Sequence, residues 1–139
     1  MLLEKLAQQL KNLNSLQVLL EEEKRCLTEK DFSSFNDTLF NKQKSLQTIA
    51  TLDRQLTNAE NLQQINASDE LSTLRSTLET ELQHCQKMNN MNGKLVALSM
   101  KSNKHLMQIM TQAKGQNSVT YNQKGSLQSG RLLGKNIQA

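Results

Sequence analysis

The chain of 139 residues has no proline, no tryptophan, one tyrosine and five glycines, and aromatic residues make up only 3% of it. Without proline, no helix need be interrupted by a missing backbone N–H, and the scarcity of glycine and aromatic residues disfavours packed sheets joined by tight turns. Hydrophobic residues reach 36%, which leaves too little apolar volume for a large globular core. Burial is therefore expected along seams between elongated helices.

Membrane insertion is also disfavoured by what the chain lacks. No apolar run approaches the roughly 20 residues that a membrane span requires. The N-terminus is charged at Glu4 and Lys5, unlike the start of a signal peptide. We therefore expect a cytoplasmic protein that does not insert directly into a membrane.

Metal sites and catalytic centres are disfavoured in the same way. Cys26 and Cys85 fall in helical patterns without a short-range partner, and His84 and His105 lack ligands at metal-like spacing, so we expect no metal. A nucleophile elbow, a glycine-rich phosphate loop and a paired-carboxylate arrangement are all missing. The chain is therefore not expected to be an enzyme or to need a cofactor.

Charge is divided unevenly along the chain. All thirteen acidic residues lie at or before Glu81, whereas residues 114–139 contain four of the seventeen basic residues and no acid. Thirteen basic residues then remain in positions 1–113, which are neutral overall. The charges of this part alternate in sign and the basic part has only Tyr121 as a stacking aromatic, so nucleic acid is not an expected partner.

Leucine-rich heptads predict three long helices, at residues of about 2–28, 32–60 and 69–113, with Asp31 as the N-cap of the second. Residues 58–69 lose the period and indicate a connection. The predicted seam of the first helix contains Leu3, Leu6, Leu10, Leu13, Gln17, Leu20, Lys24 and Leu27. That of the second contains Phe32, Phe35, Leu39, Lys42, Leu46, Ile49, Asp53 and Leu56. That of the third contains Leu71, Leu74, Leu78, Glu81, Cys85, Met88, Asn92, Leu95, Ser99, Ser102, Leu106, Ile109 and Ala113.

These patterns predict an all-α fold, an elongated antiparallel coiled-coil bundle of three long helices. Residues 1–113 would form the body, and residues 114–139, which hold four of the five glycines, a flexible tail. At about 45 residues and 1.5 Å per residue, the third helix would outreach the hairpin formed by the first two. Its distal half would then be incompletely covered.

A second apolar stripe, built on Val96, Met100 and Met107, runs along this distal half of the third helix. Five of the six methionines lie in the same stretch, and methionine adapts to irregular surfaces. Two interpretations remain open. The stripe is either a docking groove for amphipathic helices of a partner, or core that packs against a second neighbour in the bundle. Gly93, beside it, indicates a kink or a close backbone approach.

Three features together make the chain resemble the FlgN family of flagellar export chaperones. They are the two-helix heptad start with Asp31 and Leu52-Asp53-Arg54, the Asn89-x-x-Asn92-Gly93 element of the third helix, and Thr120-Tyr121-Asn122-x-x-Gly125 in the basic tail. The resemblance implies a cytoplasmic, non-enzymatic chaperone of the flagellar type III secretion system. Such a protein binds the helical C-terminal segments of hook–filament junction (hook-associated) subunits, prevents their premature association and delivers them to the export gate.

The resemblance also implies roles for particular residues. Asn89, Asn92 and Gly93 would handle the client, and Tyr121 with Gly125 would bind the cytoplasmic domain of the export gate, with the export ATPase complex as a further candidate partner. Combined with the second stripe, the predicted client-binding set is Met88, Asn89, Asn92, Gly93, Val96, Met100 and Met107.

Two alternatives remain beside the export chaperone. The first is a structural or adaptor coiled coil of a secretion apparatus, in which the heptads serve self-association, for example as a homodimer. The second is a basic-tailed protein that binds nucleic acid or an anionic membrane, which strong salt dependence would reveal.

Overall fold

The computed structural model describes residues 1–112, and within them the chain forms five helices and no strand. The helices are α1 (Leu2–Glu29), α2 (Phe32–Leu56), α3 (Ala59–Ala67), α4 (Asp69–Ser102) and α5 (Lys104–Gln112). The all-α class is therefore confirmed, whereas the predicted number of three helices is wrong for this part of the chain. The predicted tail, residues 114–139, lies outside the described residues.

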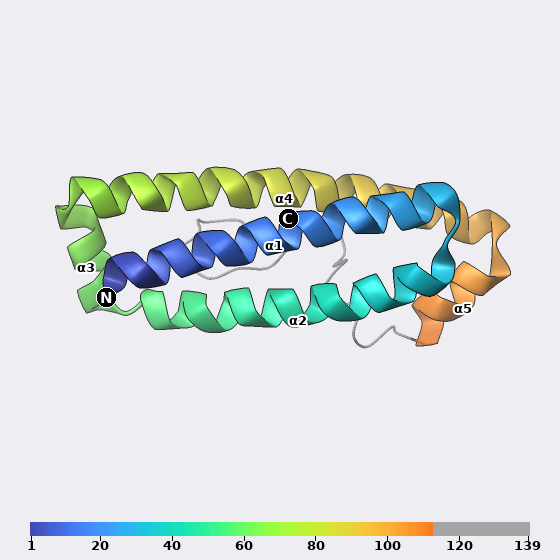
Figure 1. The fold of residues 1–139 in the computed structure, drawn as a ribbon, viewed down its shortest axis with the longest axis horizontal. Coiled ribbons are helices and arrows are strands. Elements are labelled where there is room, and N and C mark those ends of the chain that lie inside the picture. Colours follow the sequence, from blue (N-terminus) through green and yellow to red (C-terminus); the bar gives the residue numbers. More distant parts are fainter. Residues whose placement is uncertain (113–139) are drawn as a thin grey trace.

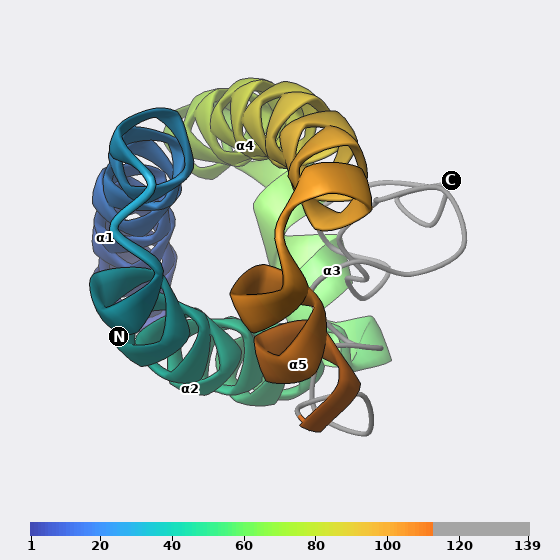
Figure 2. The same ribbon diagram turned by 90° about the vertical axis from the view of Figure 1, so that its right-hand side faces the viewer.

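The three long helices α1, α2 and α4 lie side by side and make an elongated bundle (Figure 1). Helix α1 is central, because it packs against both α2 and α4, which do not pack extensively against each other. Helix α2 runs antiparallel to α1, while α4 runs parallel to it (Figure 1). Short helices complete the two ends of the bundle: α3 contacts α4 at one end, and α5 contacts α4 and α2 at the other. The view along the bundle shows α5 turned back beside α2 (Figure 2).

The hairpin between α1 and α2 is built from two local features. Lys30 ends α1 in the left-handed conformation, with φ 60° and ψ 32°, and the Asp31 N–H donates to the carbonyl of Cys26 at 2.9 Å. Asp31 then begins α2, because its carboxylate accepts from the Ser34 N–H at 3.2 Å. The sequence prediction of an Asp31 cap is confirmed.

The second connection is more regular than its sequence indicated. Residues expected to form a loop contain α3, which begins where the Asn58 side chain accepts from the Asn61 N–H at 2.8 Å. Ile65 is fully buried and holds α3 in the core. Ser68 both ends α3 and caps α4, accepting from the Leu71 N–H at 3.3 Å. Polar residues that weaken a long helix thus act here as caps at both ends of a short one.

The expected third helix is broken near its end. It continues through Gly93 and stops at Ser102, because Asn103 is extended, with φ −140° and ψ 109°. The Asn103 side chain accepts from the Leu106 N–H at 3.0 Å and so caps a new helix, α5. This break lets Leu106 and Ile109 turn back into the bundle and become buried. The prediction of one continuous helix over residues 69–113 is therefore wrong, and Ala113 lies outside the described residues.

The seams were predicted with unequal success. All eight seam positions of α2 are buried. Helix α1 buries Leu6, Leu13, Leu20 and Leu27 as expected, but the positions between them are Gln9, Leu16 and Glu23 instead of Leu10, Gln17 and Lys24. Helix α4 likewise buries Leu82, Asn89 and Val96 instead of Glu81, Met88 and Leu95. At Gln9 and Asn89, a polar residue thus occupies an interior place although an apolar neighbour, Leu10 or Met88, was available.

Candidate functional site

A layer of four buried polar side chains crosses the bundle where α1, α2 and α4 meet. We call Glu23, Lys42, Asn89 and Asn92 the polar layer; each of them is at most 1% exposed. Lys42 Nζ donates to Glu23 Oε1 and Oε2 at 3.3 and 3.1 Å, and also to Asn89 Oδ1. Asn92 Nδ2 donates to Glu23 Oε1 at 2.9 Å and to the Leu20 carbonyl at 2.8 Å. One network therefore joins all three long helices.

The charges of the polar layer balance but are strongly desolvated. Burial lowers the pKa of Lys42, and the neighbouring Glu23 carboxylate opposes this effect only in part. A paired buried charge contributes little net stability, whereas an unpaired one costs several kcal/mol, about 3–5. The arrangement therefore disfavours any packing of the three helices that separates Lys42 from Glu23.

The polar layer lies between two apolar clusters. Toward α3, the first cluster is formed by residues of α1, α2, α3 and α4, including Leu16, Leu46 and Leu82. Toward α5, the second is formed by Cys26, Leu27, Phe32, Phe35, Leu39, Val96, Leu106 and Ile109. Met100 is partly buried and packs against this second cluster. For Val96 and Met100, the structure therefore agrees with the interpretation of the second stripe as core.

The predicted client-binding residues are not brought together on one surface. Asn89, Asn92 and Val96 face the interior, while Met88, Gly93 and Met100 are partly buried. Met107 is 46% exposed, and it lines an open hollow on α5 together with Lys104, Gln108, Thr111 and Gln112. Tyr121 and Gly125, the predicted export-gate residues, lie outside the described residues.

Sequence reasoning missed two apolar side chains that the structure leaves at the surface. Met91 and Leu98, one heptad apart on α4, are 56% and 63% exposed. Met107 of α5 is a third exposed apolar side chain in this part of the chain. The sequence does indicate that Met91 and Leu98 are exposed, since both residues alternate with lysines at spacings of three and four.

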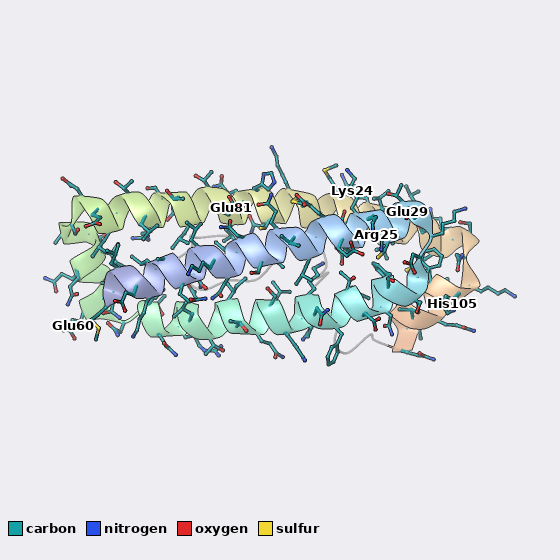
Figure 3. All side chains as sticks on the ribbon, viewed as in Figure 1. Lys24, Arg25, Glu29, Glu60, Glu81 and His105 are labelled. Carbon is teal, nitrogen blue, oxygen red and sulfur yellow. The ribbon has the colours of Figure 1, made fainter. Side chains whose placement is uncertain are left out.

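The α1–α2 turn at the α5 end carries three surface ion pairs, all made by Arg25. Arg25 donates to Glu29 at 3.0 Å and to Asp31 at 3.4 Å, and also pairs with Glu22. Figure 3 shows Arg25 and Glu29 near this end of α1, with His105 of α5 at the same end of the bundle. The His105 ring lies 6.4 Å from that of Phe32, centroid to centroid. Water and salt screen the exposed ion pairs of Arg25, so these pairs order the turn more than they stabilise the fold.

Burial disfavours the reactive thiolate form of both cysteines. Cys26 and Cys85 are both free and buried. Burial raises the pKa of Cys85 to about 12 and also raises the pKa of Cys26. Within residues 1–112, no group of three His, Cys, Asp or Glu side chains is placed to hold a metal ion. No helix of this part is long and apolar enough to cross a membrane.

These features define a class of protein: an elongated helical bundle whose accessible apolar side chains are suited to contacts with other helices. The chain matches the sequence model of the family described as FlgN protein over residues 1–129, and it belongs to this family of flagellar chaperones. No curated protein and no solved structure gave a significant match.

Proposed function

We propose that the protein is a cytoplasmic export chaperone of the flagellar type III secretion system. It binds the helical C-terminal segments of hook–filament junction subunits, prevents their premature association and delivers them to the export gate. Membership of the FlgN family supports the chaperone role. The observation that supports a helical client is the concentration of exposed Met91, Leu98 and Met107 on α4 and α5.

The buried asparagines take a different role in this proposal from the one that the resemblance implied. Asn89 and Asn92 hold the bundle together through Lys42 and Glu23, so they support the client site without touching the client. Client contact is assigned to the accessible residues at the α5 end, Met107 among them. Delivery is assigned to Tyr121 and Gly125, through the cytoplasmic domain of the export gate.

Calorimetric titration of a C-terminal junction-subunit fragment into the full chain tests this proposal. We expect low-micromolar or tighter binding with a negative heat-capacity change, the sign of buried apolar surface. Met107→Ser should weaken binding about threefold to tenfold, since roughly half a methionine side chain remains to be buried, and should leave the thermal midpoint unchanged. Tyr121→Ala should spare client binding and weaken binding to the export-gate domain.

Two results would overturn the proposal. If neither calorimetry nor co-elution detects the junction fragment on the full chain, the client function is refuted. If Tyr121→Ala weakens client and export-gate binding equally, the separation of client contact from delivery is wrong.

A further inference from the structure

A narrow stripe of exposed side chains runs along the outer side of α4, opposite the buried side. We call it the outer stripe: Lys87, Met91, Lys94, Leu98 and Lys101. Spacings of four and three place these five residues within about 80° of the helix circumference, opposite the buried positions. The helix itself forms an outer edge of the bundle (Figure 1). The outer stripe is thus a two-heptad seam without a partner in the described structure.

Three observations set the outer stripe apart from an ordinary solvated face. Both of its apolar members are more than half exposed. The same side of α4 is polar toward its N-terminus, where Thr73, Thr77 and Thr80 occupy the equivalent positions. Elsewhere on the bundle, exposed Val18 has no apolar residue three or four positions away on α1, and exposed Phe40 has Lys44 Nζ 4.6 Å from its ring centroid. The apolar periodicity is therefore confined to the C-terminal half of α4.

The charge on the outer stripe itself has one sign. No acidic residue follows Glu81 in the chain, so Lys87, Lys94 and Lys101 have no carboxylate on their own half of α4. The carboxylates of Glu22 and Glu29 on neighbouring α1 are paired with Arg25. A helix that docks its apolar side on Met91 and Leu98 would therefore place its flanking positions beside lysines, as e and g positions do in coiled coils.

We propose that the outer stripe seats an acidic amphipathic helix of a client subunit, about 15 residues long, with apolar residues every three or four positions and carboxylates beside them. This proposal rests on the export-chaperone function and deepens it by naming the chemistry of the client helix. Apolar contact on Met91 and Leu98 supplies most of the affinity. The lysines set the orientation of the client helix and the preference for acidic sequences.

The test uses the full chain and a C-terminal junction-subunit fragment in calorimetric titrations. Met91→Ser with Leu98→Ser should weaken binding about tenfold to hundredfold. The matched control is Val18→Ser with Phe40→Ser, which removes two similarly exposed apolar side chains elsewhere and should leave the affinity unchanged. Circular dichroism and thermal midpoints should match the unmodified chain for both variants, since none of these four side chains is buried.

Charge reversal tests the acidic chemistry separately. Lys87→Glu, Lys94→Glu and Lys101→Glu together should weaken binding about tenfold or more, because three attractive charge pairs with the acidic helix become repulsive. The control reverses the exposed Lys5, Lys11 and Lys24 of α1, which changes the net charge equally. A fragment whose acidic residues facing the stripe are changed to lysine should bind the reversed chain better than the unmodified chain.

The outcomes separate this proposal from the function on which it rests. If the fragment binds the unmodified chain, the serine variant and the reversed chain equally, the outer stripe proposal falls and the chaperone function stands. If the fragment does not bind the unmodified chain, the chaperone function falls and the stripe proposal with it. If the α1 control weakens binding as much as the reversal on α4, the effect belongs to net charge and the outer stripe is not the site.

Discussion

Replacing Lys42 by methionine would measure how strongly the stability of the bundle depends on the ion pair between Lys42 and Glu23. Methionine preserves the length and most of the volume of the lysine stem but removes the ammonium group. Glu23 would then keep a carboxylate in the core with Asn92 Nδ2, at 2.9 Å, as a remaining donor. Glu23→Met creates the opposite imbalance, leaving the Lys42 ammonium beside the Asn89 amide oxygen.

The expected magnitudes follow from burial. Both side chains are fully buried, so each single substitution leaves a desolvated charge and should lower the free energy of unfolding by about 3–5 kcal/mol. Against a total of about 5–15 kcal/mol, that loss should lower the thermal midpoint by roughly 10–20 °C. The double variant removes both charges. It should lose only about 1–3 kcal/mol, mainly from weakened hydrogen bonding of the two asparagines.

Urea unfolding of the four chains at pH 7, followed by circular dichroism, measures this double-mutant cycle. The double variant should be more stable than either single variant. Glu21→Met, at an exposed position of α1, is the control and should stay within about 0.5 kcal/mol of the unmodified chain. Single losses that add within about 0.5 kcal/mol in the double variant would refute a direct Lys42–Glu23 interaction.

Two further predictions concern other parts of the bundle. Lys30→Gly should raise the free energy of unfolding by about 0.5–1 kcal/mol in the same urea assay, since Lys30 has φ 60°; no gain, or a loss, would contradict the left-handed turn. In a Cys26→Ser variant, Cys85 should react with a thiol reagent at pH 8 about a thousandfold more slowly than in the unfolded chain, because burial raises its pKa from 9.0 to about 12. Because the folded chain holds the Cys85 thiol proton more tightly than the unfolded chain, the free energy of unfolding should be at its full value below pH 9 and should fall as the pH rises from 9.0 toward 12. Labelling of the folded and unfolded chains at similar rates would show that the thiol is accessible.

Much of the secondary structure could be read from the sequence because it depends on neighbours within one or two helical turns. Asp31 begins α2 through the N–H of Ser34, three residues away, and the seam of α2 follows its heptad at every position from Phe32 to Leu56. Such features need no knowledge of the rest of the chain. The resemblance to the FlgN family could be recognised for a related reason, since its motifs are short strings of residues that can be read directly from the sequence.

The candidate site could be predicted only in part, because hydrophobicity alone does not decide which side of a helix is buried. Asn89 and Asn92 were assigned to a client, and the structure instead uses their amides inside the bundle. Met91 and Leu98 were left out, although they are among the most exposed apolar residues. Two adjacent sets of positions on α4 both repeat every seven residues, and local periodicity does not decide which of the two sets is buried.

The sequence by itself determined that the protein is helical, where α1 and α2 begin, and that acidic residues are missing from the second half of α4. Tertiary structure decided that Glu23 is buried, that the helix breaks at Asn103 and that α5 turns back on α2. The physical reason is that a buried polar group is tolerated only with a partner, and the partners of the polar layer are 19 to 69 residues apart. Only the packing of α1 against both α2 and α4 brings those partners within hydrogen-bonding distance.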